Sequence, residues 1–453
     1  MNIIIVGCGT VGDAICRTLV KEGHNITVID KDAEALEDLA NSCDVTGIIG
    51  NGVDVSLLRS AGAERADLLI AITLNDEINI LSCLAAKKLG VKHSAARVRN
   101  PEYSEYIELM KSEMGLSFTI NPELAAAKEI ARVLRFPAAS GIDTFAHGQV
   151  ELAEFTVPDE SPIAGQALLG LRESLGINFL ICAVKRSDKV HIPGGNFVIE
   201  SGDVLSIAAA ESELNKFFKA AKGYKKPPKN VIIVGASKTT HYLSELLKSK
   251  GTKTNLTVIE HDHDKASALA ENFSYNIIRA DATKQGVLAA EGIEHADAFL
   301  ALTDSDEENA IMSMYSSTFG VPKTVTMIRS LPYIDLFKNA GIETIISPGL
   351  MTVSYILRFV RGIANSQNAS EIESLHKVMD DKTEALEFIV KNDVEGITGI
   401  PLKQLKKKSN TLLACIVRDG DIIIPSGEDI ICRGDTVIVI TQNTINSIKD
   451  IKL

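Results

Sequence analysis

The sequence contains no long apolar run. Every window of about eighteen residues, the length that a membrane-spanning helix needs, is interrupted by polar or charged residues. The amino terminus lacks the basic stretch, the apolar stretch and the small-residue cleavage site of a signal peptide. We therefore expect a cytoplasmic protein that is not itself inserted into a membrane.

Paired cysteines and excess positive charge are also missing. The seven cysteines are scattered and include no C-x-x-C pair, so they fit neither a zinc site nor a disulfide framework, and we predict no metal site. Lysine and arginine number 47 against 59 aspartates and glutamates, which gives a formal net charge of −12. This balance argues against nucleic acids and anionic lipids as general partners.

What the sequence does contain is an internal repeat. A chain of 453 residues is expected to form about two to four domains, and here two halves share one pattern. Matching segments occur in the same order in both halves: Ile3–Gly7 with Val231–Gly235, Thr27–Asp32 with Thr257–Asp262, Ala71–Glu77 with Ala301–Glu307, and Glu200–Val204 with Cys432–Thr436. The order of these matches indicates a tandem duplication.

The first part of each half predicts a doubly wound parallel sheet. Residues 1–136 alternate β-branched apolar runs with amphipathic segments of helical period, as βαβ units do. Strands are expected at Ile3–Val6, Ile26–Ile29, Val45–Ile49, Leu68–Ile72 and Ala95–Val98.

The second part of each half predicts a small α+β lobe. In the first half, strands are expected at Leu152–Val157, Leu180–Val184 and Val204–Ala208, with a helix over Ala167–Leu175 and a linker over Ala221–Lys229. We therefore expect an α/β protein with four domains: Rossmann-like domains at 1–136 and 228–370, and small lobes at 137–222 and 371–453.

A glycine-rich loop in the first half predicts a nucleotide site. Gly7-Cys8-Gly9-Thr10-Val11-Gly12 follows a strand and opens the helical segment Asp13–Lys21, and Asp30 ends the next strand. Gly7 permits a tight turn, Gly9 lets the backbone approach a phosphate, and Gly12 allows close packing of helix on strand. The helix N-terminus attracts phosphate. Asp30 is suited to bind a ribose 2′-hydroxyl and to repel a 2′-phosphate, so NAD(H) or adenosine nucleotides are favoured over NADP(H).

Other strand ends point to the same crevice, since ligands of open α/β sheets bind at the carboxyl ends of the strands. Candidate contacts are Asn51 and Gly52 after the third strand, Thr73 and Leu74 after the fourth, and Arg97 at the end of the fifth. Arg97 could bind a phosphate through two hydrogen bonds. The alternative is a surface ion pair, which is more strongly expected for Arg99 than for Arg97. For Asn75 and Asp76, ligand contact and helix capping stay open.

The second half carries an altered loop, Gly235-Ala236-Ser237-Lys238-Thr239-Thr240, in which Ser237 replaces Gly9 and Thr240 replaces Gly12. Side chains at these positions should obstruct a dinucleotide. Glu260 keeps an acid at the ribose position and Lys238 could still attract a phosphate. We predict that the second half keeps the fold and binds nucleotide weakly or not at all.

Together these motifs resemble the TrkA family, the nucleotide-binding regulatory subunits of prokaryotic Trk potassium uptake systems, built from two regulator-of-K⁺-conductance (RCK) units. The residues that carry the resemblance are Ile3–Gly12, Val28–Asp32, Thr73–Asn79, Ala96–Pro101 and, in the second copy, Thr303–Asn309. The resemblance implies NAD(H), or ATP or ADP, bound at Gly7–Gly12, Asp30, Thr73 and Arg97. It also implies a homo-oligomer, a dimer or tetramer ring, on the inner face of the cell membrane, beneath a separate potassium-translocating membrane subunit that the nucleotide gates.

Two apolar helices fit this role, over Pro122–Arg135 and Leu350–Ala364. In related proteins the helix at this point crosses to a neighbouring subunit, and packing on its own sheet is the alternative. Two other functions stay open: an NAD-dependent dehydrogenase, and a sensor for another cation channel or antiporter. The dehydrogenase would need a catalytic acid or base, and none of the candidates, His24, His93, His147 and His191, has a recognisable catalytic partner.

Overall fold

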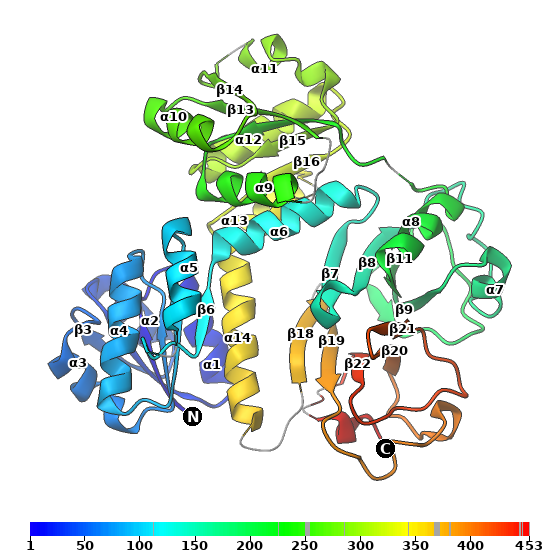
Figure 1. Cartoon of the computed structure of the whole chain (residues 1–453), viewed down its shortest axis with the longest axis horizontal. Helices are drawn as coiled ribbons and strands as arrows, with labels where there is room; N and C mark the ends of the chain where they lie inside the picture. Colours follow the sequence, from blue (N-terminus) through cyan, green and yellow to red (C-terminus); the bar gives the residue numbers. More distant parts are fainter. Residues whose placement is uncertain are drawn as a thin grey trace. The chain divides into compact units, whose positions relative to one another are not determined.

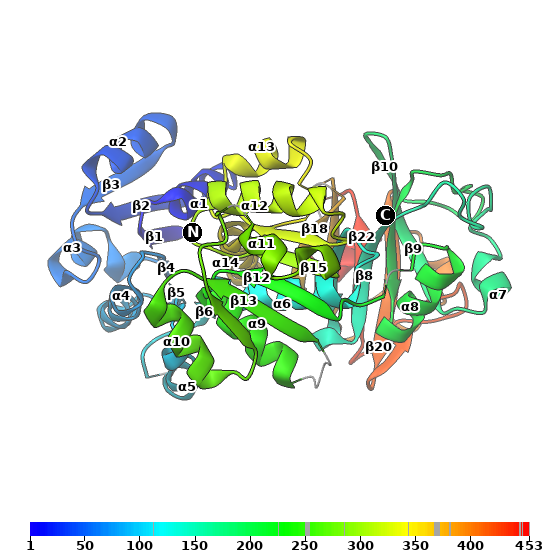
Figure 2. The ribbon, with the colours of Figure 1, turned by 90° about the horizontal axis from the view of Figure 1, so that it is seen from above.

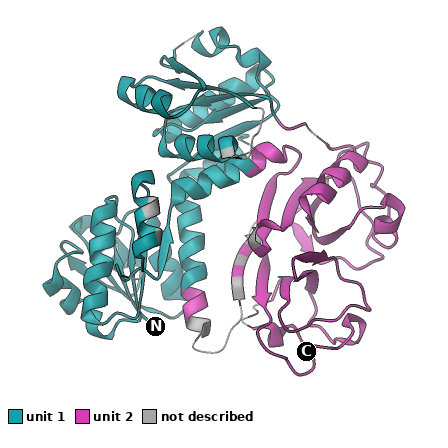
Figure 3. Cartoon of the chain, in the orientation of Figure 1, with its two compact units in different colours: residues 1–131, 228–359 teal, residues 132–227, 360–453 magenta. Residues whose placement is uncertain are grey.

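The computed structural model describes residues 1–111, 113–224, 226–249, 254–284, 286–342, 344–366, 372–379, 382–443, 445 and 447–452. The chain divides into two compact units (Figure 3): residues 1–131 with 228–359, and residues 132–227 with 360–453. Each unit thus combines one part of the first repeat with the matching part of the second. The expected boundary at 370/371, and Lys225 of the expected linker, lie outside the described residues.

The first unit contains two six-stranded parallel sheets, one from each repeat (Figure 1). Their strand orders are β3-β2-β1-β4-β5-β6 and β14-β13-β12-β15-β16-β17. The strands are β1 (Asn2–Val6), β2 (Asn25–Asp30), β3 (Val45–Ile49), β4 (Leu68–Ala71), β5 (His93–Arg97), β6 (Phe118–Ile120), β12 (Asn230–Val234), β13 (Asn255–Glu260), β14 (Asn276–Arg279), β15 (Ala298–Ala301), β16 (Thr324–Met327) and β17 (Ile345–Ile346). This order confirms the predicted pair of Rossmann-like sheets.

Several helices of the first unit are capped by short polar side chains, although α1 is not. The carboxylates of Asp32 and Asp54 and the side-chain oxygens of Asn75 and Asn100 accept hydrogen bonds from backbone N–H groups at the starts of α2 to α5. The helices are α1 (Thr10–Lys21), α2 (Ala33–Ser42), α3 (Val55–Ser60), α4 (Asp76–Leu89), α5 (Pro101–Met110), α6 (Pro122–Arg135), α9 (Lys238–Ser249), α10 (His263–Asn272), α11 (Val287–Ala290), α12 (Asp306–Thr318), α13 (Tyr333–Asn339) and α14 (Pro348–Ser366). Among the described residues, no helix combines the length and apolar character needed to cross a membrane.

The two repeats exchange helices within the chain. Phe359 of α14, from the second repeat, stacks on Phe118 of β6 in the first, with ring centroids 4.8 Å apart. The side-chain nitrogen of Asn121, just before α6, donates to the hydroxyl of Tyr242 on α9 at 2.7 Å. Figures 1 and 2 both show α6 next to α9. The crossing expected between subunits therefore takes place between the two repeats of one chain.

The second unit contains two five-stranded antiparallel sheets, ordered β10-β9-β11-β8-β7 and β18-β19-β22-β20-β21. Their elements are β7 (Gly141–Phe145), β8 (Val150–Thr156), α7 (Leu171–Leu175), β9 (Phe179–Arg186), β10 (Lys189–His191), β11 (Val204–Ala209), α8 (Glu211–Ala220), β18 (Ile372–Val378), β19 (Thr383–Ile389), β20 (Thr411–Arg418), β21 (Asp421–Ile423) and β22 (Thr436–Thr441). Small α+β lobes were predicted, but the helix expected over Ala167–Leu175 begins only at Leu171. Its shortening has a physical reason: Gly170 has a φ of 82°, which helical residues do not adopt.

Each lobe has its own apolar core, and a further apolar cluster joins the two lobes. Phe145, Leu152 and Cys182 of the first lobe cluster with Ala385 and Cys415 of the second. Polar contacts cross the same boundary: Nδ1 of His376 lies 2.6 Å from a carboxylate oxygen of Asp143. All seven cysteines are free, so apolar burial and these polar contacts hold the lobes together without disulfides.

Candidate functional site

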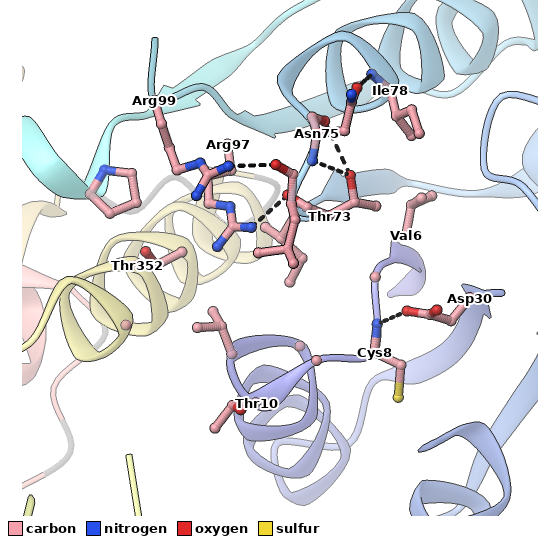
Figure 4. Close-up of a pocket in the computed structure, with 18 of the residues that line it drawn as sticks. Val6, Cys8, Thr10, Asp30, Thr73, Asn75, Ile78, Arg97, Arg99 and Thr352 are labelled. Carbon is pink, nitrogen blue, oxygen red and sulfur yellow. Dashed lines mark hydrogen bonds between the residues drawn. The ribbon is translucent and has the colours of Figure 1, made fainter. Parts of the chain in front are cut away.

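A cleft of about 990 Å³ opens at the carboxyl end of the first sheet (Figure 4). Its lining includes every residue that the sequence singled out for nucleotide contact: Gly7, Cys8, Gly9, Thr10, Val11, Gly12, Asp30, Asn51, Gly52, Thr73, Leu74 and Arg97. The structure thus brings together residues that are spread over the ends of five neighbouring strands, β3, β2, β1, β4 and β5, and the start of α1. Their contact with a nucleotide stays a prediction.

The glycines of the loop differ in why they must be glycine. Gly7 has a φ of 112°, a conformation that only glycine adopts readily. A Cβ on Gly12 would collide with the carbonyl oxygen of Gly7. Gly9 faces no protein atom within 4 Å of where its Cβ would lie. Because Gly9 also forms the uncapped start of α1, the backbone amides of this helix are open to an anion in the cleft.

The carboxylate of Asp30 is hydrogen-bonded to the backbone of the glycine loop. One of its oxygens accepts a hydrogen bond from the backbone amide of Cys8, and the other accepts one from Asp32 at 3.0 Å. Figure 4 shows Asp30 beside the loop. Each carboxylate oxygen can accept further hydrogen bonds, so a ribose hydroxyl can still be bound there. Burial and the charge of Asp30 raise the pKa of the Cys8 thiol to about 11, so this thiol stays protonated near neutral pH.

Thr73 is held by Asn79, a residue that the sequence analysis did not single out for the site. The side-chain oxygen of Asn79 accepts from the amide and the hydroxyl of Thr73, and its nitrogen donates to the carbonyls of Thr73 and Arg97. Asn79 is fully buried. The hydroxyl of Thr73 therefore donates its hydrogen bond to the protein itself. Thr73 lines the cleft in a loop whose conformation Asn79 fixes.

Arg97 is buried, and the structure gives it no ion pair among the described residues. Its Nη2 donates to the carbonyl of Thr73 at 2.5 Å, while its Nε has no hydrogen-bond partner. Burial, together with the nearby charge of Arg99, lowers the pKa of Arg97 to about 10, so it still carries a charge near neutral pH. A buried guanidinium with spare donors at the cleft is suited to bind an anion. The alternative of a surface ion pair does not hold for Arg97.

Arg99 does form ion pairs. Its guanidinium lies 3.7 Å from Asp76 and 4.0 Å from Glu123. Asp76 also accepts from the backbone amides of Arg99 and Asn100 at 2.8 and 2.9 Å. Asn75 caps α4 through the amide of Ile78 at 2.7 Å. Asn75 and Asp76 thus have structural roles, and Asn75 also lines the cleft.

Gly52 is explained by packing. A Cβ on Gly52 would collide with the side chain of Val6 on β1, so glycine is needed there whether or not a ligand binds. Asn51 turns its side-chain oxygen toward the backbone amide of Val53 at 3.4 Å. Both residues line the cleft on the side of β3, where an adenine would lie.

The second repeat has a smaller cleft, of about 320 Å³, at the equivalent strand ends. There Ser237 caps α9 by accepting from the amide of Thr240. The hydroxyl of Thr240 donates to the carbonyl of Gly235 at 2.6 Å, so the protein itself accommodates this side chain, and its obstruction of a dinucleotide stays a prediction. Met327, fully buried, stands where the first repeat has Arg97. The second site therefore lacks both the open helix start and the buried arginine.

An ion-paired cluster lies beside both clefts. Asp304 binds Lys265 at 2.9 Å and Arg329 at 2.6 Å. Lys265 and Asp304 line both clefts, and Arg329 and Lys238 line the first. Side chains of the second repeat thus border the first site. Sequence reasoning missed this border because nothing in the spacing of the motifs tells which repeat faces which.

Two of the candidate catalytic histidines lie in the first unit, and neither lines the cleft. Nδ1 of His24 lies 3.2 Å from the terminal amine of Met1, and burial lowers the pKa of His24. His93 begins β5, at the end of the strand opposite to the cleft. His191, in the second unit, is exposed, and the side chain of His147 lies outside the described residues.

The same family model matches both repeats of the chain. The model of the TrkA-N domain matches residues 3–122 and again residues 231–348, and the model of the TrkA-C domain matches residues 152–222. A Trk system potassium uptake protein TrkA homolog from Archaeoglobus fulgidus is 32% identical over 455 residues, which cover all of both chains. The Trk system potassium uptake protein TrkA of Haemophilus influenzae is 28% identical, covering 98% of this chain and 97% of that one.

Solved structures show the same fold. The crystal structure of the GsuK RCK domain has a TM-score of 0.63 at 17% identity and covers 99% of this chain and 93% of that one. A GsuK channel bound to NAD has the same TM-score at 18% identity and covers 99% of this chain and 77% of that one. Because the TrkA-N model matches both repeats and full-length relatives align from end to end, the chain belongs to the TrkA family of Trk system potassium uptake proteins.

Proposed function

We propose that this chain is a nucleotide-sensing regulatory subunit. It binds NAD(H), or ATP or ADP, in the cleft of the first repeat, and it controls a separate membrane protein that translocates potassium. The observation that carries the proposal is the uncapped start of α1 at Gly9, with Asp30 on one side and the buried Arg97 on the other. Together they offer a hydrogen-bond acceptor for a ribose and donors for phosphates.

The comparisons support both halves of this proposal. Relatives that align over the whole chain are named potassium uptake proteins of Trk systems. GsuK has been solved with NAD, and also with ADP at a TM-score of 0.52. A regulatory role, with binding and no turnover, fits a cleft in which no histidine is found among the described lining residues and the one thiol, Cys8, stays protonated. A dehydrogenase is the weaker candidate for the same reasons.

Self-association is part of the proposal. Large apolar side chains are exposed on α4 and α5 of the first repeat and on α12 and α13 of the second: Leu81, Tyr106, Leu109, Met110, Ile311, Met314, Tyr315, Tyr333 and Leu336. Leu81 matches Ile311, and Tyr106 matches Leu336, in the sequence repeat. Repeated apolar surfaces of this kind support assembly of several chains, in a ring beneath the membrane partner on its cytoplasmic side.

The test is equilibrium binding of NADH, NAD⁺, ATP and ADP to the full-length chain, with the number of sites counted per chain. We expect one site for which all four compete. Arg97→Met, which installs the residue of the second repeat, should weaken the binding of phosphate-bearing ligands by about tenfold or more. Arg65→Met, at an exposed position before β4, should not. Two equal sites, or no binding, would contradict the proposal.

A further inference from the structure

The strand order places different side chains at the two ends of the first cleft. Across the sheet the order is β2, β1, β4, β5, β6, so Asp30 at the end of β2 and Glu123 just after β6 lie on opposite sides of the glycine loop. Neighbouring strands are about 4.8 Å apart, so three spacings, roughly 14 Å, separate the loop from the end of β6. A ligand with its ribose at Asp30 and its diphosphate at α1 reaches the side of Glu123 only with whatever follows the diphosphate.

Three charged side chains line that distal part of the cleft: Arg97, Arg99 and Glu123. Glu123 has a side chain that is 12% exposed, with one oxygen 4.0 Å from Nη1 of Arg99 and the other without a hydrogen-bond partner. Arg97 likewise has an Nε without a partner. Buried polar groups in folded proteins are normally paired. A ligand with an acceptor for Arg97 and a donor for Glu123 would give both groups hydrogen-bond partners after small side-chain rotations.

The candidate ligands differ at this point of their structure. ATP continues beyond the diphosphate with a third phosphate, which carries negative charge and offers only acceptors near neutral pH. NAD(H) continues with a second ribose and a carboxamide, which offer hydroxyl and amino donors as well as acceptors. A carboxylate repels the first group and accepts hydrogen bonds from the second.

We propose that Glu123 is a specificity-determining residue, whose carboxylate makes the first cleft prefer a dinucleotide over a nucleoside triphosphate. The inference rests on the proposed nucleotide site and names its ligand class. Positive charge opposes Glu123 from the second repeat: Arg329 is already bound to Asp304 at 2.6 Å, whereas Lys238 lines the cleft and is exposed. Removing the charge of Glu123 leaves this lysine and the arginines to attract a third phosphate.

The experiment measures the dissociation constants of NADH, ADP and ATP for the full-length wild type, Glu123→Gln and Glu123→Asp, first in EDTA and then with Mg²⁺. In the wild type we expect NADH to bind more tightly than ATP. In Glu123→Gln the ratio of ATP affinity to NADH affinity should rise about tenfold, with ADP nearly unchanged because ADP ends before Glu123. Glu123→Asp, which keeps the charge, should keep the wild-type order. Glu102→Gln on the exposed start of α5 is the matched control.

Two results would overturn the inference. One is an unchanged ratio in Glu123→Gln while ADP still binds, since bound ADP shows that the variant is folded and the site intact. The other is a loss of ATP affinity in Glu123→Gln with Mg²⁺ present, which would make the carboxylate a cation ligand that assists the triphosphate. If ADP, ATP and NADH all fail to bind the wild type, it is the proposed function itself that fails.

Discussion

The side-chain oxygen of Asn79 accepts hydrogen bonds from both the amide and the hydroxyl of Thr73, at 2.8 and 2.7 Å. Asn309 and Thr303 repeat the arrangement at 2.9 and 2.8 Å in the second half of the chain. The brace is thus kept in a repeat that has lost the glycine loop and the buried arginine. Its first role is to support the sheet, and only in the first repeat does it also position Arg97, through the carbonyl of Arg97.

This pair predicts different outcomes for two equivalent variants. Asn79→Ala and Asn309→Ala should each destabilise the protein by about 2–3 kcal/mol, because each leaves buried donors and acceptors unpaired. Only Asn79→Ala should also weaken nucleotide binding. Thermal unfolding and titration of both variants check this, and equal losses of affinity in the two would contradict the assignment of the site to the first repeat.

The glycines of the loop predict a separation of binding from stability. Gly9→Ala should keep the folded state, since no protein atom lies near the new Cβ, yet reduce nucleotide affinity because the methyl group enters the cleft. Gly12→Ala should destabilise the protein by about 1–3 kcal/mol through overpacking against the carbonyl of Gly7. Unfolding curves beside binding curves distinguish the two. Wild-type nucleotide affinity in Gly9→Ala would mean that the phosphates do not bind beside Gly9.

Asp30 is best tested by a conservative change. Its carboxylate also holds the amides of Cys8 and Asp32, so Asp30→Ala would loosen the loop as well as remove a ribose contact. Asp30→Asn keeps one oxygen acceptor and removes the charge. We expect the affinity for NADPH relative to NADH to rise about tenfold, because repulsion of the 2′-phosphate disappears. A ratio that does not move would mean that the ribose does not bind at Asp30.

Glu123 predicts a pH-dependent stability difference. Burial raises the pKa of this carboxyl above its usual value of 4.5. A group whose pKa is raised in the folded state contributes stability below its unfolded pKa and loses that contribution as the pH rises through the folded pKa. Glu123→Gln, which does not titrate, should therefore be more stable than the wild type at about pH 8. Melting temperatures of both proteins from about pH 4 to 8 should converge at the acid end, and parallel curves would contradict the burial of a charged carboxylate.

The exposed apolar residues predict a change in assembly. Leu109→Glu on α5 together with Leu336→Glu on α13 should convert the proposed oligomer into smaller species, since charge is poorly tolerated in an apolar interface. Light scattering after size-exclusion chromatography measures the mass directly. Nucleotide affinity of the same variant serves as the folding control, because neither residue lines the cleft. An unchanged mass would place the contacts between chains on another surface.

Much of the fold and part of the site could be predicted because their signals are local. The glycine loop, Asp30 and the period of the apolar runs lie within short segments, and the strands formed within a few residues of their expected bounds. The roles of Asn79 and Glu123 could not be predicted in this way. Asn79 binds a carbonyl on a neighbouring strand, and Glu123 meets Arg99 only after β6 has joined the sheet. The requirement for glycine at 52 likewise depends on Val6, which lies far away in the sequence.

The exchange of helices between the repeats has a consequence for how the protein is made and inherited. Phe118 receives its stacking partner Phe359 only after the second repeat has been synthesised, so the first sheet leaves the ribosome before α14 can pack on it. Covalent linkage then guarantees one partner for each first repeat, at a local concentration that separate chains would not reach. The second repeat can therefore complete the packing of the first whether or not it binds a ligand of its own.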